Sequence, residues 1–586
     1  MKRRIVSLLL CASMLLTGIL ATGCAGDGDD SLTTETGDES SALVRTSMTL
    51  TLWVPTECEV DEETGELPEE TQDALEEVEA AINKITVSKY DTAIKLYAIP
   101  TDDYEEAVKK QMQDIKDRKE KAKKEAEERR KAEREAAKRG ETLPPTEKAD
   151  KEEGENPYDL IVNSSPTHPH VENNQMDIFL VRGYDDYKFY VDNMFVEALD
   201  EEINGTSKVL KQYIYPDFLE AAKVDGITYA VPNNHMVGEY TYLLANKELA
   251  TKYGKTETDL MNIFNNYEFV KSVAENEEGV TPVWGEISPD YIQYWSGQGS
   301  GQFSVLATNS KAYDPTKKIE ALEGVVFKNV MDVQAFYDST YYQKLYTENG
   351  WISNAESVDN FAYGFVTTTP DVVEEMYGDT HYIYAYRVPQ GTLDDYCASM
   401  FAVSSHTKDK ARAMEIITHL NTQTDLRTIL QYGVEGTHWK YDEIDDSVIV
   451  KTSDVYKMNI NDTGNVYMTY PDYNTPMIWD ASKKQNLDSF YPVTYYMTDY
   501  VHDGNKEIIA EFDKFCAEIK KEIDGMTAAE FKDQKTRLKD TIDRNPYYQM
   551  LTYTNGKYGK TEEDGYFEDN SIVYMWSEKV KLIKEG

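Results

Sequence analysis

The chain has 586 residues, of which 106 are Asp or Glu and 61 are Lys or Arg, so its formal net charge at pH 7 is −45. This charge excludes a nucleic-acid-binding protein, because each phosphate contact needs a cationic side chain, and it also opposes adsorption of the protein to anionic lipid. The length is sufficient for two or three domains.

The first residues are typical of an export signal. A basic segment, Lys2–Arg4, precedes an almost entirely apolar run at 5–20, which is shorter than a comfortable membrane span of about 20 residues. The Ala-Thr-Gly-Cys that follows resembles the lipobox of bacterial lipoproteins, so we expect a signal peptide at 1–23 and lipidation of Cys24; an ordinary signal peptide is the alternative. The small, polar and acidic residues that follow predict a flexible tether at 24–46.

An α/β order begins after the tether. Strands are predicted at 47–54, 93–99 and 177–181. Between the first two strands, a helix is indicated by the spacing of Leu75, Val78, Ile82 and Ile85. Strands that alternate with helices imply a parallel sheet with right-handed crossovers. Asp102 and Glu105 are predicted to form a capping box at the start of the next helix.

That next helix has an unusual composition. From Lys116 to Arg139 every uncharged residue is Ala, and Glu120–Lys124 is one of several ion pairs of the favourable i,i+4 orientation. A helix without aliphatic residues has nothing to bury, so 102–157 is predicted to be a solvated insertion rather than a coiled coil.

Further α/β segments occur in the second half. After ITYAVP at 227–232, the segment 401–439 predicts a short strand, a loop and an amphipathic helix with Ala413, Ile416, Ile417 and Leu420 on one face. Beyond the signal and Cys24, the only cysteines are Cys58, Cys397 and Cys516. They are widely spaced, without metal-binding spacing, so the fold is expected to depend on a hydrophobic core rather than on disulfides.

Seven segments together resemble family 1 extracellular solute-binding proteins, the maltose-binding-protein-like group, in the type found as lipoproteins of Gram-positive bacteria. In chain order they are LWVP (52–55), GYDDY (183–187), DEEING (200–205), DGITYAVPNN (225–234), YLLANKELATKYG (242–254), AVSSHTKDKARAMEII (402–417) and QYGVEGTHW (431–439). The resemblance covers about 47–100 and 175–500, and the 102–157 insertion falls outside it.

The resemblance implies an α/β, two-lobed fold of the periplasmic-binding-protein type II, in which each lobe is a sheet flanked by helices and a hinge closes on the ligand. The first crossing is expected near Pro232–Glu239 and the return near Phe361–Thr369. The corresponding boundaries are lobe 1 at 47–234, lobe 2 at 235–358, a return to lobe 1 at 359–403, and lobe 2 with C-terminal helices at 404–586.

Residue type and position along the chain indicate the candidate ligand-binding residues. Sugar capture needs flat apolar faces with amide, hydroxyl and carboxylate partners, and ligands of open α/β sheets lie beyond the carboxyl ends of strands. The candidates at predicted strand ends, hinge segments and glycine-containing loops are Trp53, Tyr184, Asn233, Asn234, Tyr240, Trp295, Thr368, Glu435, His438 and Trp439. For each aromatic residue a core position is the alternative.

Motifs for enzymatic chemistry fail on inspection. The Gly-Lys-Thr triplets at 254–256 and 559–561 lack the glycine that a P-loop requires, because Leu249 and Thr554 occupy those positions. The GQGSG at 297–301 lacks the form of a nucleophile elbow, and His168-Pro169-His170 is not a zinc motif. We therefore expect no cofactor, no metal and no catalytic residue.

The sequence thus predicts a monomeric substrate-binding lipoprotein of an ABC importer, held on the extracellular face of the membrane by its lipid alone. A separate ATPase and permease subunits are implied, and the expected ligand is an oligosaccharide. A peptide or other polar solute, or a role as a ligand-sensing subunit, remains open, and a secreted glycan-active enzyme is the remote alternative.

Overall fold

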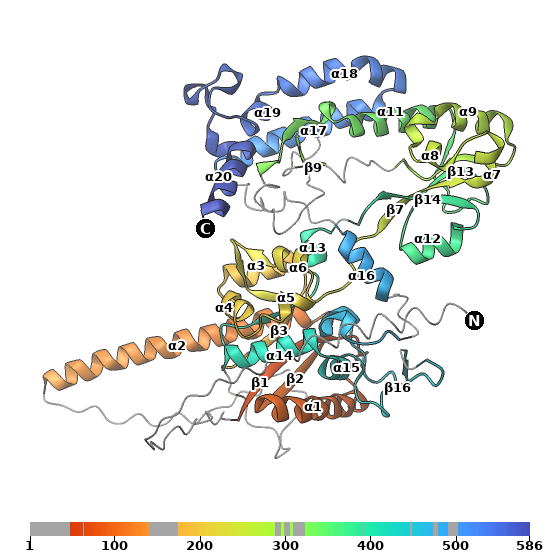
Figure 1. The fold of residues 1–586 in the computed structure, drawn as a ribbon. Coiled ribbons are helices and arrows are strands. Elements are labelled where there is room, and N and C mark those ends of the chain that lie inside the picture. Colours follow the sequence, from red (N-terminus) through yellow and green to blue (C-terminus); the bar gives the residue numbers. More distant parts are fainter. Residues whose placement is uncertain are drawn as a thin grey trace, which may run out of the picture. The chain divides into compact units, whose positions relative to one another are not determined.

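A computed structural model gives the fold of most of the chain (Figure 1). It describes residues 47–61, 64–139, 171, 174–287, 295–297, 305–308, 323–389, 391–445, 448–472, 479–489 and 502–585. The predicted signal peptide, Cys24 and the tether lie outside the described residues, as do residues 141–157 of the predicted insertion and His168 to His170.

The first sheet has five strands in the order β2-β1-β3-β15-β6. Their bounds are Met48–Thr56 (β1), Thr92–Pro100 (β2), Ile178–Val181 (β3), Ala230–Pro232 (β6) and Met400–Val403 (β15). β1 pairs in parallel with β2 and β3, which confirms the three predicted strands and their parallel arrangement. β15 is antiparallel to both β3 and β6, so this sheet is mixed.

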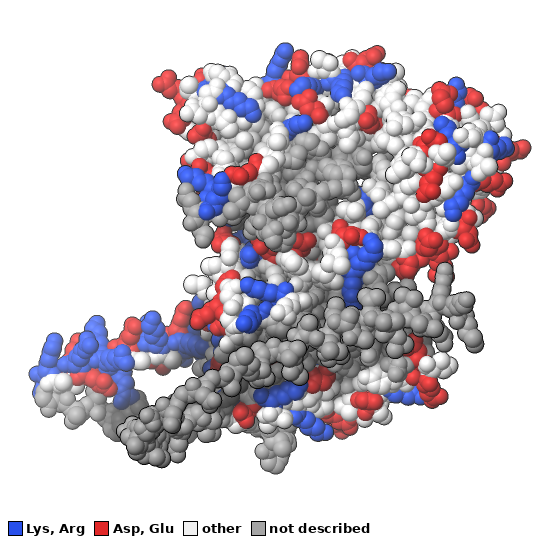
Figure 2. Space-filling model, viewed as in Figure 1, with Lys and Arg blue, Asp and Glu red and all other residues white. Residues whose placement is uncertain are grey.

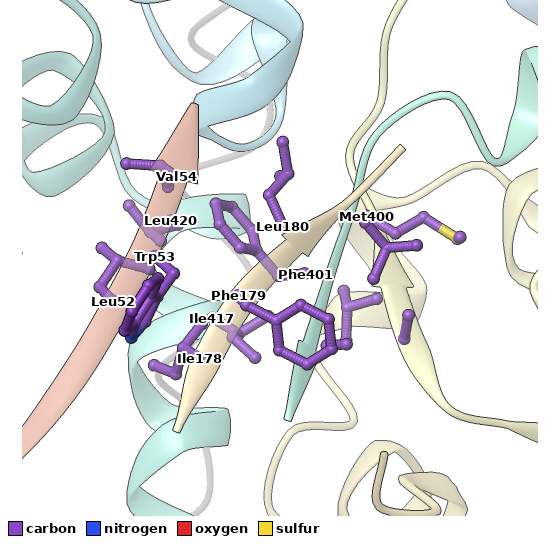
Figure 3. Close-up of a cluster of buried hydrophobic side chains, with 14 of the residues drawn as sticks. Leu52, Trp53, Val54, Ile178, Phe179, Leu180, Met400, Phe401, Ile417 and Leu420 are labelled. Carbon is purple, nitrogen blue, oxygen red and sulfur yellow. The ribbon is translucent and has the colours of Figure 1, made fainter. Parts of the chain in front are cut away.

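The first hydrophobic core surrounds this sheet. Figure 3 shows side chains of β1, β3 and β15 packed together with Ile417 and Leu420 of a helix. The helices that belong to this part are Glu69–Tyr90 (α1), Tyr104–Lys138 (α2), Tyr184–Asp192 (α3), Asp200–Asn204 (α4), Leu210–Tyr213 (α5), Pro216–Ala221 (α6), Leu393–Tyr396 (α13), Lys410–Thr422 (α14) and Thr424–Tyr432 (α15). The described residues also contain two short antiparallel pairs, Lys223–Val224 (β4) with Ile227–Thr228 (β5), and Trp439–Tyr441 (β16) with Ile449–Lys451 (β17).

A buried carboxylate joins three segments of this part. Asp177, which is fully buried, accepts hydrogen bonds from the backbone N–H of Thr51 (2.8 Å) and from the backbone N–H of Lys408 (2.6 Å). It also accepts from the hydroxyl of Thr407 (2.9 Å) and from the side-chain amide of Gln175 (2.8 Å). The carboxylate therefore connects β1 and the residue before β3 to the loop that follows β15.

The second sheet has the order β12-β8-β13-β7-β14. Its strands are Tyr240–Asn246 (β7), Thr281–Trp284 (β8), Ile352–Ser353 (β12), Phe361–Thr368 (β13) and His381–Arg387 (β14). The helices around it are Lys247–Lys252 (α7), Glu257–Leu260 (α8), Tyr267–Asn276 (α9), Gln334–Glu348 (α11) and Pro370–Tyr377 (α12). Two α/β sheets with separate cores and flanking helices confirm the predicted fold class.

The expected return of the chain to the first lobe near Phe361–Thr369 was wrong. β13 pairs with β7 and β8 inside the second sheet, and the chain re-enters the first sheet only at β15. The expected assignment of 404–586 to lobe 2 was also wrong for its first part, because α14 and α15 contribute to the first core.

A third hydrophobic core is built mainly from the C-terminal helices. They are Lys506–Gly525 (α17), Ala528–Asp543 (α18), Pro546–Leu551 (α19) and Ile572–Glu585 (α20), with Val330, Met331, Val333 and Phe336 packed against them. A small sheet of Trp295–Gly297 (β9), Val305–Thr308 (β10) and Phe327–Asn329 (β11) also belongs to the described residues. Cys58, Cys397 and Cys516 are buried thiols, the first two in the first core and Cys516 in the third.

The predicted insertion helix is present as α2. Its first turns pack on the core through Val108, Met112 and Ile115, whereas every residue from Glu120 to Glu135 is exposed. Figure 2 shows basic and acidic side chains side by side along this exposed part. The predicted capping box was wrong: the N-cap is Asp103, which makes no side-chain capping hydrogen bond.

The boundary of the solvated part also differs from the prediction. The Lys116 ammonium lies 5.3 Å from the centre of the Phe195 ring, and Arg118 donates to the side-chain oxygen of Asn174 at 2.9 Å. Long cationic side chains can cover apolar surface while their charges reach polar partners. The helix therefore contacts the first lobe beyond Ile115, and its solvated segment is 120–135.

Replacing exposed side chains of α2 should leave the stability of the protein almost unchanged. We expect Lys124→Ala to change the free energy of unfolding by no more than other surface substitutions do, which is within about 0.5 kcal/mol. Met112→Ala is the control, because removing a buried side chain of this size costs about 2–5 kcal/mol. Calorimetry of both variants checks this expectation, and an equal loss in the two would contradict it.

Candidate ligand-binding site

The carboxyl ends of β1, β2, β3 and β6 share one edge of the first sheet, since β6 runs in the same direction as β3. Arg182 directly follows β3 at this edge. Its guanidinium donates to the Glu105 carboxylate, with Nε at 2.6 Å from Oε1, and to the carbonyl oxygen of Thr101 at 3.3 Å. The edge thus carries a partly buried ion pair between the β3 end and the start of α2.

Asp462 adds a second carboxylate to this edge. Its Oδ2 lies 4.0 Å from Nη1 of Arg182, and its side chain is buried. Burial raises the pKa of Asp462 to about 6, while the charge of Arg182 acts in the opposite direction. Arg182 therefore lies between two carboxylates at the place where ligands of open α/β sheets bind.

The first crossing, Asn233–Glu239, leads from β6 to β7, and its amides hold the chain rather than face solvent. Asn233 is fully buried and donates to the Ser399 hydroxyl at 2.9 Å. Asn234 donates to the carbonyl oxygen of Tyr213 at 2.5 Å and accepts from the backbone N–H of Tyr215 at 3.1 Å. These bonds tie the predicted hinge to the first core.

His235 continues this pattern. Its two ring nitrogens lie 2.9 Å from the carbonyl oxygen of Asn233 and 2.7 Å from that of Asp395, which belongs to the second crossing, Val388–Ser399. Burial lowers the pKa of His235, although both carbonyl oxygens favour the protonated ring. One imidazole thus connects the two crossings.

A third segment contacts the first crossing. Helix α16 (Trp479–Asp488) places Asn486 so that its amide donates to the carbonyl oxygen of His235 at 2.6 Å and accepts from the backbone N–H of Val237 at 3.0 Å. From the same helix, Asp488 accepts a hydrogen bond from the hydroxyl of Tyr240, the first residue of β7. The start of the second sheet is therefore fixed to α16.

The end of the second sheet carries two partly exposed aromatic side chains, with the exposed Thr367 and the buried Thr241 beside them. Phe365 of β13 and Tyr386 of β14 lie edge to face, with ring centres 5.2 Å apart. Next to them, Thr241 faces Thr367 across the β7–β13 pair, and their hydroxyl oxygens are 3.2 Å apart. An apolar platform beside a pair of hydroxyls is suited to a saccharide ring, whose CH groups stack and whose hydroxyls form hydrogen bonds.

Arg387 lies on the opposite side of Thr241 from Thr367. The β7–β14 register shifts between Ala385 and Arg387, so Arg387 pairs with Thr241 and Tyr386 is the extra residue of a β-bulge. Bulges of this kind re-aim side chains and are frequent beside binding sites. Thr367, Thr241 and Arg387 therefore lie across three adjacent strands.

The ligand-binding candidates predicted from the sequence differ in how far they are buried. Trp53 is fully buried, stacked on Tyr97 with ring centres 4.4 Å apart, and it presents no face to solvent in this structure. His438 and Trp439 are buried as well, whereas Glu435 is exposed. Tyr240 is also buried, and its hydroxyl donates a hydrogen bond to Asp488.

Of the remaining candidates, Tyr184 and Thr368 lie at strand ends of the two large sheets. Tyr184 follows β3 and is half-buried, and its backbone N–H donates to the carboxylate of Asp394 at 2.9 Å. Thr368 is the half-buried last residue of β13, paired with Tyr240. Trp295 begins β9, and its side chain lies outside the described residues. Ligand contact by these residues stays a prediction.

Sequence reasoning missed Phe365, Tyr386, Arg387 and Arg182. The run Tyr-Ile-Tyr-Ala-Tyr-Arg at 382–387 carried a usable signal, since alternate tyrosines indicate one face of a strand. Nothing in the sequence indicates that a bulge brings Arg387 into register with Thr241.

Across the part of the chain that the structure describes, no group of three or more His, Cys, Asp or Glu side chains could hold a metal ion. Within the same ranges, no helix has the length and hydropathy needed to cross a membrane.

Comparison with known proteins shows which class of protein this chain resembles. No family model matches the chain. A curated relative from Streptococcus pneumoniae serotype 4 (strain ATCC BAA-334 / TIGR4), named carbohydrate ABC transporter substrate-binding protein, is 25% identical over 329 residues, which make up 50% of this chain. The match spans 63% of that relative's own length, which is less than two thirds. The chain is thus similar to a substrate-binding protein of an ABC transporter.

Two solved structures are also similar over most of their length. The N-glycan transport solute binding protein (NgtS) of Streptococcus pneumoniae is 16% identical with a TM-score of 0.47, covering 92% of this chain and 99% of that one. An extracellular solute-binding protein of Bifidobacterium longum subsp. infantis is 11% identical with a TM-score of 0.43, covering 91% and 98%. At these scores neither likeness adds to the fold described above.

Proposed function

We propose that this protein is the substrate-binding lipoprotein of an ABC importer and that it captures an extracellular oligosaccharide. The observation that carries the proposal is the second-sheet edge, where Phe365 and Tyr386 offer aromatic surface beside the hydroxyls of Thr241 and Thr367. The name of the Streptococcus pneumoniae relative, a carbohydrate ABC transporter substrate-binding protein, supports the same class of ligand.

Capture would work by closure of two lobes. The two crossings join the carboxyl edge of the first sheet to the end of the second sheet at which β7 begins and β13 and β14 end. A ligand that contacts both edges would stabilise the closed state, because it gains interactions there that the open state lacks. Arg182 with its two carboxylates would supply polar partners from the first sheet.

The lobes proposed for this motion follow the observed sheets. The first would comprise 47–234 and 399–472, and the second 239–388, with the C-terminal helices as an additional core. Of the predicted contacts, we keep Tyr184, Trp295, Thr368 and Glu435 as ligand candidates and assign the buried Trp53 a role in the core.

Location and partners follow from the same proposal. Export with lipidation at Cys24 would hold a monomer at the extracellular face of the membrane, and diacylation would give stable attachment where a single chain would not. Permease subunits would receive the ligand, and the ATPase would be another chain, since this one carries no P-loop motif. No chemical step on the ligand is proposed.

The test is a ligand screen with the purified full chain. Neutral oligosaccharides and peptides are added in a thermal-shift assay, because a ligand at one hundred times its Kd stabilises the native state by about 2.7 kcal/mol. Stabilisation by oligosaccharides, with every glycan recovered intact, is the expected result. Stabilisation by peptides alone would contradict the ligand class, and cleaved glycan would contradict the binding role.

The anchor is tested separately. Cys24→Ala is expected to remove lipid labelling and to release the protein from the membrane fraction, or to leave it uncleaved, because the thiol that carries the lipid is lost. Fractionation and metabolic labelling with a fatty acid measure this. If the variant is cleaved at the same bond and stays equally membrane-bound, the lipoprotein assignment is wrong.

A further inference from the structure

Arg387 differs from the other arginines that the structure describes as buried or half-buried. Arg182 contacts Glu105, Arg412 donates to the carbonyl oxygen of Asp91 at 3.0 Å, and Arg427 donates to the carbonyl oxygen of Ile460 at 2.6 Å. Among the described residues, no side-chain hydrogen bond or ion pair satisfies Arg387, although it is half-buried. A guanidinium has five donors, so this position leaves an unusual number of them available.

The charge of the chain makes this environment more unusual. With 106 acidic residues the protein has carboxylates in excess. Exposed basic side chains on the helices of the second sheet form ion pairs with them; Lys252, for example, lies 2.7 Å from the carboxylate of Glu277. Burial alone, without an acidic neighbour, lowers the pKa of Arg387 from its usual value. Arginine nevertheless stays protonated in proteins, so a charge is held there without compensation.

The position of Arg387 is defined by the backbone. The β-bulge at Tyr386 sets Arg387 opposite Thr241, at the end of the sheet where β14 gives way to the second crossing. Thr241 in turn faces Thr367, so the cation ends a row of hydroxyls that runs beside the Phe365–Tyr386 platform. A ligand ring stacked on the platform would have its substituents along this row.

We propose that Arg387 binds a carboxylate of the ligand, and that the captured oligosaccharide contains an acidic sugar, a uronic or a sialic acid. This rests on the oligosaccharide-binding function proposed above. The planar guanidinium matches a carboxylate with two parallel hydrogen bonds, and such charge-assisted bonds are about twice as strong as neutral ones. A neutral sugar hydroxyl would leave the charge of Arg387 uncompensated in the closed protein, and the net charge of −45 would repel acidic glycans elsewhere on its surface.

The experiment compares matched glycans on the full chain by calorimetry. One arm uses a glucuronic-acid-containing oligosaccharide, a second a sialylated oligosaccharide, and each is paired with its methyl ester, in which the carboxylate charge is removed but the ring is kept. We expect one acidic glycan to bind at least tenfold more tightly than its ester, with an affinity that falls as salt is added. Which arm shows the preference identifies the acidic sugar.

Variants assign the preference to Arg387. In Arg387→Gln the ratio of the acidic to the ester affinity is expected to fall about tenfold or more, and Arg387→Lys should retain part of it, since an ammonium keeps the charge but loses the paired geometry. Arg544→Gln, at the exposed arginine that forms the C-cap of α18, should leave the ratio unchanged. Circular dichroism checks that each variant is folded.

The outcomes separate this inference from the proposed function. If neutral oligosaccharides bind but no acidic glycan binds better than its ester, the carboxylate inference is overturned and the oligosaccharide-binding function remains. If the preference exists but survives in Arg387→Gln, the assignment to this residue is overturned. If no glycan of any kind binds, both the carboxylate inference and the proposed oligosaccharide-binding function are contradicted.

Discussion

Replacing Phe365 by alanine is expected to weaken oligosaccharide binding about thirtyfold, because truncating a central aromatic anchor commonly costs about 2 kcal/mol or more. Phe365 is the residue of choice because its ring is partly exposed and its orientation is fixed by Tyr386, 5.2 Å away. A prearranged ring loses little entropy on binding, so most of its stacking energy contributes to affinity. Isothermal calorimetry measures the change.

Two further variants test whether stacking on Phe365 causes that loss of affinity. Phe365→Leu keeps an apolar side chain but removes the flat face, so it should lose most of the affinity if stacking is the cause. Phe567→Ala removes an exposed phenylalanine next to the short helix that begins at Glu568, and it should leave the affinity unchanged. An unaltered dissociation constant in Phe365→Ala would refute the platform, and the search for stacking residues would move to Trp295.

Replacing Asp177 by alanine is expected to lower the free energy of unfolding by about 3 kcal/mol or more. The carboxylate is fully buried, and without it the backbone N–H of Thr51 loses its acceptor inside the core and that of Lys408 loses its acceptor at a partly buried site. Each buried donor left unsatisfied costs about 1–3 kcal/mol.

Asp177→Asn distinguishes charge from shape. It keeps the volume but directs an amide N–H at one of the two backbone donors, so it should also destabilise strongly. Asp192→Asn is the control, since Asp192 forms an exposed i,i+4 pair with Lys188 at 3.2 Å and should change stability by less than about 0.5 kcal/mol. Chemical denaturation measures all three, and a mild effect in both Asp177 variants would contradict the role assigned to this carboxylate.

The sequence predicted the first sheet well because its signals are local. Strands β1, β2 and β3 were recognised from apolar runs between helical periodicities, and the parallel order followed from the connections. The path of β13 was predicted wrongly because its apolar residues show that it is a strand but not which sheet it joins. Its partners β7 and β8 are set by tertiary packing.

The candidate site was harder to predict for a related reason. Trp53 was chosen as a residue near the end of a strand, but β1 continues to Thr56, and both faces of the strand are covered. Residues on a strand that is buried on both faces are core residues whatever their type. Arg387 was missed because its position depends on a bulge, which leaves no mark in apolar periodicity.

The placement of the cysteines makes the separate cores chemically distinguishable. Cys58 and Cys397 are buried thiols of the first core, and Cys516 is a buried thiol of the third. A thiol-reactive probe can modify a buried thiol only when its surroundings open, and opening of different regions requires different free energies. The order in which these thiols are alkylated in the native protein would therefore report which core opens first.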